Sequence, residues 1–259
     1  MENKTINNIE TELYGTVLCV RFDRPAKKNA LTIAMYERLN EILKEASQNP
    51  AIRVLVFSST SDSFTAGNDL RDFLRYATGK INDDAPVFRF IHDLAKFDKP
   101  IVSAVDGLAV GIGLTMLLHC DFVYVTERTK LMAPFVNLGL VPELGSSKLL
   151  VELIGERRAA EILLLGNSIS GERAVDLGIA NEIISAGKLE AKALHIAKNL
   201  SEKPPAALRL SKDLIRPRGE ILKTMKKEND YIKRQLQSRE AIEAITAVLE
   251  KRKPDFSQF

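Results

Sequence analysis

The sequence of 259 residues contains no tryptophan, only two cysteines and only three histidines. Cys19 and Cys120 are far apart in the chain and form no C-x-x-C pair, which argues against a disulfide framework and favours a reducing compartment. The histidines form no H-E-x-x-H pattern, so neither a histidine metal site nor a catalytic triad is expected. We expect both cysteines to be buried and unreactive. We expect the scattered histidines to be structural: His92, His119 and His195.

Long apolar runs are also missing. The longest, residues 108–118, has 11 residues and contains two glycines and a threonine, whereas a membrane-spanning helix needs about 20 residues. Residues 1–12 are polar and contain no apolar segment of a secretory signal, and residues 257–259, SQF, are not an SKL-type peroxisomal signal. We therefore expect a cytoplasmic protein without a membrane partner.

Neither sign of charge is in large excess. The 37 Lys and Arg residues nearly balance the 34 Asp and Glu residues, and 45% of the chain is hydrophobic, as is typical of a globular protein. A chain of this length buries roughly 70–75% of its unfolded surface, so its fold needs neither disulfides nor a metal. Residues 203–253 carry 14 basic and 7 acidic residues, an asymmetry that would suit an anionic partner. Because these charges are spread along helical patterns without clustered aromatics, solvated helix faces explain them better than a nucleic-acid site does.

Strand and helix patterns alternate along most of the chain. Residues 14–22 are rich in β-branched and aromatic side chains and run into a turn with the sequence DRP, which predicts a strand. A helix capped by Thr32 should follow and end at Asn49-Pro50. The residues at helical spacing that should face the core are Met35, Leu39, Ile42, Leu43 and Ala46.

Three near-continuous apolar runs predict strands buried on both faces of a sheet: residues 52–57, 101–105 and 122–125. A helix over residues 86–97 separates the first two. Such alternation implies parallel β-α-β units with right-handed crossovers, so the predicted fold class is α/β. From about residue 185 the pattern is helical, with Pro204-Pro205 at a helix N-terminus. We expect a core over residues 1–200 and a helical region over residues 201–259 that packs on the core or on a neighbouring subunit.

A glycine-containing segment, FTAGNDL, follows the first buried strand, at the edge where an α/β sheet places its ligand crevice. Ala66 and Gly67 permit the backbone to approach a ligand closely. Asn68-Asp69 can begin a helix and leave its first amides unpaired.

A second segment, GLAVGIGLT, follows the strand over residues 101–105. Gly111 and Gly113 flank Ile112, whose amide should be unpaired at a helix N-terminus. Two such amides, one from each segment, could hold an oxyanion. The alternative is that the glycines serve only tight turns and close packing.

The segment LGLVPELGSS places Glu143 among apolar residues, glycine and proline. Burial among apolar groups raises the pKa of a carboxyl group, which makes it a stronger base near neutral pH. Glu143 is therefore the candidate base. The alternative is an exposed glutamate in the first turn of a helix, where the helix dipole favours it.

Other catalytic signatures are missing. The sequence has no G-x-S-x-G nucleophile elbow and no G-x-x-x-x-G-K-[ST] phosphate loop. The spacing G-x-x-x-G-x-G of Gly107, Gly111 and Gly113 departs from the dinucleotide-binding fingerprint.

In their order and spacing, the segments DRPAKKNAL, FTAGNDL, GLAVGIGLT, CDFVYV and LGLVPELGSS resemble the enoyl-CoA hydratase/isomerase (crotonase) superfamily over nearly the whole chain. The resemblance implies a spiral of β-β-α units followed by a helical C-terminal trimerisation region. It also implies an acyl-CoA substrate as partner and a homotrimer or a dimer of trimers. Because coenzyme A is part of the substrate, no metal or redox cofactor is implied.

By the same resemblance, the backbone N–H groups of Asn68 and Ile112 hold the thioester oxygen while an enolate forms. Donors of this kind are worth on the order of 3 kcal/mol each. The positions that match coenzyme A and substrate contacts in the family are Ala26, Lys27, Lys28, Ala66, Gly67, Asp69, Leu70 and Gly111.

Departures from the family pattern indicate the branch. Thr115 and Phe135 stand where hydratases of the family have their two glutamates, which argues against hydration. Glu143 instead matches the lone glutamate of the peroxisomal-type enoyl-CoA delta isomerases. The predicted activity is therefore conversion of 3-enoyl-CoA to 2-trans-enoyl-CoA with Glu143 as the one base. The alternatives are a hydratase or another acyl-CoA reaction that uses Asp69 or Asp72, and a non-catalytic acyl-CoA-binding protein.

Overall fold

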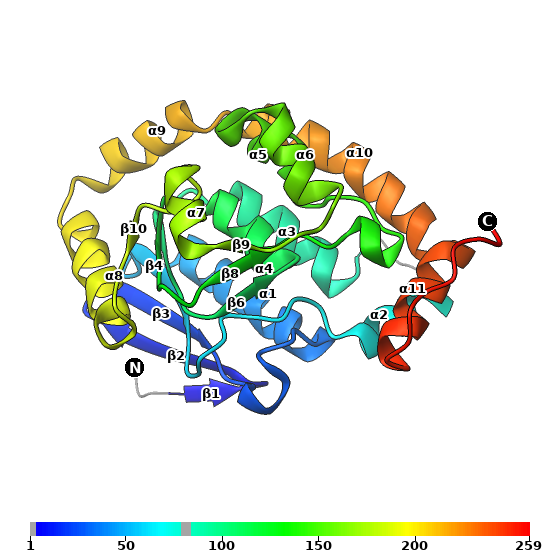
Figure 1. The fold of residues 1–259 in the computed structure, drawn as a ribbon. Helices are drawn as coiled ribbons and strands as arrows, with labels where there is room; N and C mark the ends of the chain where they lie inside the picture. Colours follow the sequence, from blue (N-terminus) through cyan, green and yellow to red (C-terminus); the bar gives the residue numbers. More distant parts are fainter. Residues whose placement is uncertain (1–3, 79–83) are drawn as a thin grey trace.

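The computed structural model describes residues 4–78 and 84–259, apart from the side chains of residues 76–78. A seven-stranded sheet has the order β1-β2-β3-β4-β5-β7-β10, and a three-stranded sheet has the order β6-β8-β9 (Figure 1). The strands are β1 (Lys4–Ile6), β2 (Ile9–Tyr14), β3 (Val17–Phe22), β4 (Val54–Ser59), β5 (Ile101–Val105), β6 (Leu108–Val110), β7 (Phe122–Val125), β8 (Lys130–Met132), β9 (Ile169–Ser170) and β10 (Glu182–Ile183). The α-helices are α1 (Ile33–Gln48), α2 (Leu70–Thr78), α3 (Pro86–Lys96), α4 (Ile112–Thr115), α5 (Ser146–Ile154), α6 (Glu156–Leu163), α7 (Gly171–Asp176), α8 (Ala186–Ser201), α9 (Pro205–Ile215), α10 (Arg218–Leu236) and α11 (Arg239–Leu249). Short 3₁₀ helices are η1 (Pro25–Lys27), η2 (Met116–His119) and η3 (Val136–Leu138).

The larger sheet begins with antiparallel strands and continues with parallel ones. β3, β4, β5, β7 and β10 run parallel, which confirms the predicted α/β class. The predicted strand over residues 14–22 was wrong at its start. Gly15, at φ +61°, turns the chain, and Tyr14 ends β2 opposite Val17 of β3. A left-handed glycine between two strands makes a tight hairpin.

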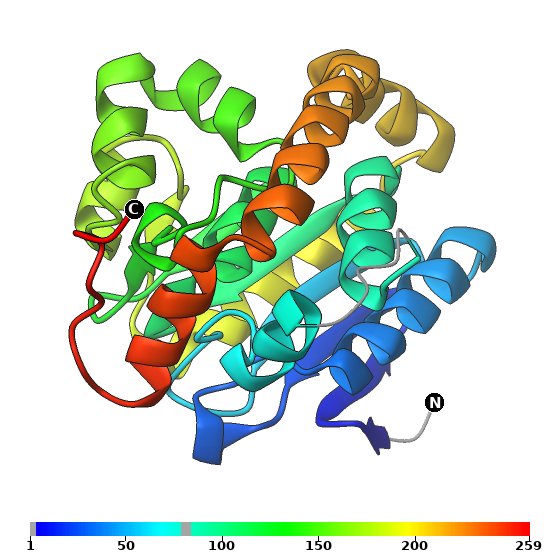
Figure 2. The same ribbon diagram turned by 90° about the vertical axis from the view of Figure 1, so that its right-hand side faces the viewer.

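Helices cover both faces of this sheet (Figures 1 and 2). Along β3, Val17 and Cys19 join the apolar cluster under α8, whereas Leu18, Val20 and Phe22 join the larger core with α1 and α3. Successive side chains of a strand point to opposite faces, so a strand covered on both sides is apolar throughout.

The predicted helix after Thr32 is confirmed as α1. The Thr32 hydroxyl accepts a hydrogen bond from the Met35 amide at 3.3 Å, and all five residues predicted to face the core are buried. The helix ends at Gln48, before Asn49-Pro50, as expected.

The three-stranded sheet was not predicted, because its strands have only two or three residues. β6 follows β5 after a turn at Gly107, which has φ +65°. A Cβ atom at Gly107 would lie 2.0 Å from the carbonyl oxygen of Asp62, so only glycine fits there.

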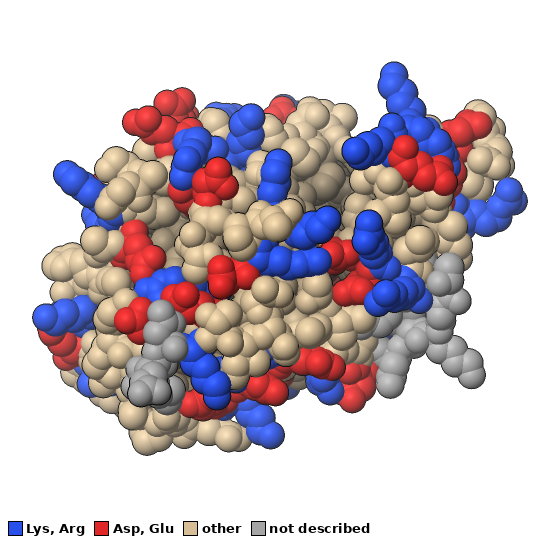
Figure 3. All heavy atoms as spheres, turned by 90° about the horizontal axis from the view of Figure 1, so that it is seen from below, with Lys and Arg blue, Asp and Glu red and all other residues tan. Residues whose placement is uncertain are grey.

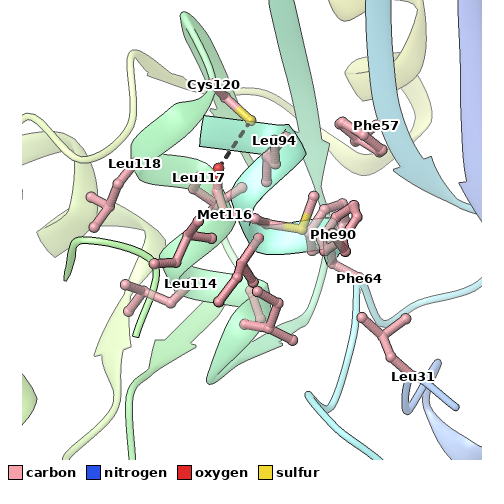
Figure 4. Packing of buried hydrophobic residues seen from close by; sticks show 14 of the residues in the cluster. Leu31, Phe57, Phe64, Phe90, Leu94, Leu114, Met116, Leu117, Leu118 and Cys120 are labelled. Atoms are coloured by element: carbon pink, nitrogen blue, oxygen red, sulfur yellow. Dashed lines mark hydrogen bonds between the residues drawn. The ribbon is translucent and has the colours of Figure 1, made fainter. Parts of the chain in front are cut away.

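The segment after β6 packs into the centre of the larger core. Figure 4 shows Met116 pointing toward Phe90, with Phe64 nearby. The Cys120 thiol donates to the Met116 carbonyl at 3.5 Å. Cys19 and Cys120 are free and buried, as predicted, and burial raises the pKa of both thiols to about 12. Such thiols are poor nucleophiles at neutral pH.

The C-terminal helices wrap around this core. α10 packs against α3 and α5, and α11 packs against α2 (Figure 2). None of the helices in the described ranges is long and apolar enough to cross a membrane. Basic residues of this region pair with acidic ones, for example Arg252 with Glu243 and Lys212 with Asp121. On the face drawn in Figure 3, basic and acidic side chains are intermixed.

Candidate active site

A backbone bridge joins the two glycine-containing segments. The Thr65 amide donates to the Leu108 carbonyl at 2.8 Å, and the Val110 amide donates to the Thr65 carbonyl at 3.0 Å. A Cβ atom at Gly113 would lie 2.6 Å from Cγ2 of Thr65, and one at Gly67 would lie 2.8 Å from the carbonyl oxygen of Val110. The glycines therefore allow the two segments to pack directly against each other.

The amide of Asn68 is left without an acceptor by a strand-like contact between Leu31 and Asn68. The Leu31 amide donates to the Gly67 carbonyl, and the Asp69 amide donates to the Leu31 carbonyl, both at 2.8 Å. In such a parallel bridge the intervening N–H points away from Leu31, and it has no acceptor among the described residues. The Tyr36 hydroxyl donates to Oδ1 of Asn68 and fixes that side chain.

The amide of Ile112 is unpaired for a different reason. Gly111, at φ +57°, turns the chain into α4, whose first residue is Ile112. The first amides of a helix have no acceptor within the helix, and nothing else in the described chain accepts from Ile112. The Gly111 amide is occupied, because it donates to the Met132 carbonyl at 2.8 Å.

A mainly apolar cavity of about 280 Å³ lies where these segments meet. Asn68, Gly111 and Glu143 line it together, so residues 75 positions apart in the sequence share one site. The remaining lining residues are Ala66, Gly67, Leu70, Phe73, Val110, Pro134, Phe135, Asn137, Leu138, Leu140, Val141, Ile232 and Val248. A concave apolar cavity with few polar groups is typical of a small-molecule site.

The Glu143 side chain is buried, with 5% of its surface exposed, so the exposed-glutamate alternative is wrong. Burial, and after it the negative charge of Glu228, raise the pKa of its carboxyl group to about 8, while the nearby Thr115 hydroxyl acts to lower it. Oε1 of Glu143 has no hydrogen-bond partner in the described chain. Burial favours the protonated form of a carboxyl group and makes it a strong base when ionised.

Other carboxylates named from the sequence are engaged elsewhere. Asp69 forms an ion pair with Arg24 at 2.8 Å and accepts from the Arg71 amide at the start of α2. Burial acts to raise the pKa of Asp69, but its hydrogen bonds with Arg24 and Arg71 outweigh burial and lower it. Asp72 accepts from the Ile33 amide at 3.1 Å. Neither aspartate lines the cavity.

The loop that resembles a coenzyme A contact lies beside the cavity. Ala26, Lys27 and Lys28 are exposed, and the Ala66 amide donates to the Lys28 carbonyl at 2.8 Å. Asn29 holds this loop, because its side chain donates to the Ser63 carbonyl at 2.6 Å. Sequence reasoning missed this role of Asn29 as well as the contact between Tyr36 and Asn68, because both depend on residues distant in sequence.

No metal site accompanies the cavity, since the described residues hold no group of three metal-ligating side chains. His119 is buried beside the Glu143 turn, where its Nε2 donates to the Leu144 carbonyl at 2.8 Å. Burial lowers the pKa of His119 to about 3, so its ring is neutral.

The chain as a whole is similar to known proteins. Residues 12–259 match the family described as enoyl-CoA hydratase/isomerase. The chain belongs to this family. It is 35% identical over 206 residues to enoyl-CoA delta isomerase 2 of Rattus norvegicus, a match that covers 78% of the chain and 52% of the relative. The chain spans only part of the length of such relatives: its matches cover 52% and 63% of two delta isomerases.

Other similar proteins match over nearly their full length. The chain is 33% identical to 1,2-epoxyphenylacetyl-CoA isomerase of Escherichia coli (strain K12), a match covering 93% of this chain and 95% of that protein. The solved structure of Pseudomonas aeruginosa OdaA is similar with a TM-score of 0.90 and 41% identity, covering 94% of this chain and 99% of that one. An E. coli 2,3-dehydroadipyl-CoA hydratase is 29% identical. Both isomerases and hydratases are therefore among the proteins similar to this chain.

Proposed function

We propose that the protein isomerises 3-enoyl-CoA to 2-trans-enoyl-CoA. The observation that carries this proposal is that Glu143 is the one titratable side chain among the described residues lining the cavity. Thr115 and Phe135, at the positions of the two hydratase glutamates, are buried and cannot act as bases. Moving a double bond needs one group that removes a proton and returns it, whereas adding water also needs a group that orients the water.

In the proposed mechanism the thioester oxygen accepts hydrogen bonds from the amides of Asn68 and Ile112. The Glu143 carboxylate removes a proton from C2, and the electron pair delocalises over the thioester and the former C3–C4 double bond as a dienolate. The protonated Glu143 then gives the proton to C4, which leaves the double bond between C2 and C3. The proton that leaves C2 is thus the one that C4 gains, and no water is consumed.

The surroundings of Glu143 suit this role. A base with a pKa near 8 is well matched to proton transfer at neutral pH, and an apolar cavity strengthens the hydrogen bonds that stabilise the dienolate. Each amide donor should contribute on the order of 3 kcal/mol to transition-state stabilisation. Lys27 and Lys28 of the exposed loop would face the phosphates of coenzyme A, with Ala26 and Ala66 near its adenine. Coenzyme A belongs to the substrate, so the proposed reaction uses no further cofactor.

The proposal is tested by mass-resolved product analysis of the purified protein with a 3-enoyl-CoA and, separately, a 2-enoyl-CoA. We expect a 2-enoyl product of unchanged mass from the first and no gain of water by the second. Glu143→Gln should abolish turnover and leave acyl-CoA binding nearly unchanged. Wild-type rates in this variant would show that Glu143 is not the base.

Hydration is the second candidate, because hydratases are among the similar proteins. A gain of one water by the 2-enoyl-CoA would favour it and would require a second catalytic group. Ligand binding without turnover of either substrate would instead favour an acyl-CoA-binding protein. A buried carboxyl group with one oxygen lacking a hydrogen-bond partner is costly to fold, which supports a catalytic role for Glu143 over a role in binding alone.

We also propose that the protein assembles as a homotrimer or a pair of trimers. Three large apolar side chains on α9 are exposed in the single chain: Leu210 by 66%, Leu214 by 85% and Ile215 by 82%. Apolar groups this exposed on one helix are typical of a surface that a partner covers. Sedimentation should therefore give a trimer or hexamer, and Leu214→Lys should shift the equilibrium toward smaller species. A wild-type monomer would contradict this proposal.

A further inference from the structure

The turn that carries Glu143 has an unusual backbone. Leu144 and Gly145 follow Glu143 with φ +57° and +71°, so two successive residues adopt the left-handed conformation. This conformation costs a leucine roughly 1–2 kcal/mol and persists only where neighbouring groups hold it. His119 holds one side, because its ring donates to the Leu144 carbonyl at 2.8 Å.

Glu228 of α10 holds the other side. Its Oε2 accepts from the Gly145 amide at 2.6 Å, and its Oε1 accepts from the Ser147 amide at 3.0 Å and the Ser147 hydroxyl at 2.5 Å. Glu228 is itself buried, with 5% of its surface exposed. Gly145 is the N-cap of α5 and has no capping side chain of its own, so a residue more than 80 positions away caps this helix.

The two buried carboxyl groups are bonded very differently. Glu228 accepts three hydrogen bonds at a helix N-terminus, whereas Oε1 of Glu143 has no partner among the described groups. Hydrogen bonds to a carboxylate and the positive end of a helix dipole both favour the charged form. Of two neighbouring carboxyl groups, the better-bonded one therefore ionises first and makes it harder to ionise the other.

No other charge competes with this effect at Glu143 in the described structure. Burial, the charge of Glu228 on α10 and the Thr115 hydroxyl on α4 are the influences that shift its pKa. His119 on η2 is neutral, and the cations Lys212 and Arg216 act on His119. Burial raises the pKa of Glu228 as well, and its hydrogen bonds with Ser147 and Gly145 oppose that rise.

We propose that Glu228 is a positioning residue that fixes the Glu143 turn and, by its negative charge, keeps Glu143 a strong base. This inference rests on the proposed function, in which Glu143 moves the proton. In this proposal the C-terminal helix α10 influences the chemistry of Glu143, which lies on a turn far from α10 in the sequence. Glu228 does not line the cavity and acts through Glu143.

The first test replaces Glu228 with glutamine, which keeps the shape and removes the charge. We expect Glu228→Gln to lower kcat, measured at pH values above the acid limb, by roughly 10-fold or more. KM should change little, because the variant alters the base and not the surface that binds substrate. The acid limb of the kcat pH profile should move to lower pH by about one unit, because a like charge near Glu143 is removed.

Glu220→Gln is the matched control. Glu220 also lies on α10 and also links it to α5, through an ion pair with Lys148 at 3.0 Å, but it is exposed. This control should leave kcat and the acid limb unchanged. An acid limb in Glu228→Gln that coincides with the wild type, or equal changes in both variants, would overturn the proposal.

A second measurement needs neither turnover nor a folded Glu228→Gln variant. In protein with ¹³C-labelled glutamate carboxyl groups, Glu228 should titrate at lower pH than Glu143, and Glu143→Gln should remove the high-pH titration and leave that of Glu228 in place, because Glu143 is still neutral while Glu228 ionises. A Glu143 carboxyl group that titrates at or below the pH at which Glu228 titrates would overturn the proposal. If the wild type turns over no enoyl-CoA, the proposed function fails, and this titration still decides the inference about Glu228.

Discussion

The raised pKa of Glu143 predicts that the protein loses stability as pH rises. The carboxyl group titrates near pH 8 in the folded chain and near its ordinary value of 4.5 when unfolded. Between these values the unfolded chain has released a proton that the folded chain still holds, so the free energy of unfolding falls with increasing pH. The stabilisation from the neutral Glu143 is complete below pH 4.5 and is lost by about pH 8.

The magnitude follows from the same two values. Each unit of difference corresponds to about 1.4 kcal/mol, so the Glu143 contribution should decrease by about 4 kcal/mol between pH 5 and 8.5. Glu143→Gln keeps the shape of the side chain and cannot ionise. The free energy of unfolding of the variant, relative to that of the wild type, should therefore rise by roughly this amount between pH 5 and 8.5.

Urea unfolding of both proteins, followed by circular dichroism at several pH values, checks this prediction. The difference between the two free energies isolates Glu143, because Glu228 and the other titrating groups are present in both proteins. A difference that stays constant from pH 5 to 8.5 would show that Glu143 titrates normally in the folded protein and would refute the reasoning.

Three further variants test contacts that hold the site or the surrounding fold in place. Tyr36→Phe removes the hydrogen bond to the Asn68 side chain, and we expect kcat/KM to fall about 10-fold without a change in fold, as steady-state kinetics would show. Gly67→Ala would place a Cβ atom 2.8 Å from the Val110 carbonyl oxygen at φ +86°, so it should destabilise the protein by roughly 1–3 kcal/mol in urea titrations and reduce turnover. Lys99→Met would remove the three hydrogen bonds that its buried ammonium group donates to backbone carbonyl groups, and thermal unfolding should show a loss of about 3 kcal/mol.

The sequence predicted those elements whose apolar pattern is long and regular. α1 was predicted with its cap and its buried face, because Thr32 and the apolar spacing lie within one segment. β5 and β7 were predicted at their observed bounds, because each is a near-continuous apolar run. The β2–β3 hairpin was missed, since the predicted strand began at Tyr14, the last residue of β2, and continued through Gly15 and Thr16 into β3.

The site was predictable only where the signal is local. The sequence around Glu143 is apolar in itself, so its burial could be anticipated. Glu228 could not be anticipated, because in sequence it is one acidic residue on a strongly charged helix. Its role depends on how α10 packs against the start of α5, which no pattern within either helix encodes.

The C-terminal helices complete the cavity and do more than cover the core. α10 contributes Ile232 to the lining and Glu228 to the Glu143 turn, and α11 contributes Val248. The proposed chemistry therefore depends both on the expected core over residues 1–200 and on the expected helical region over residues 201–259. Without α10, Gly145 and Ser147 would lose the carboxylate that binds their amides, and nothing would then hold Leu144 and Gly145 in their left-handed conformation from that side. The orientation of the proposed base is thus set by a helix that contributes no reacting group.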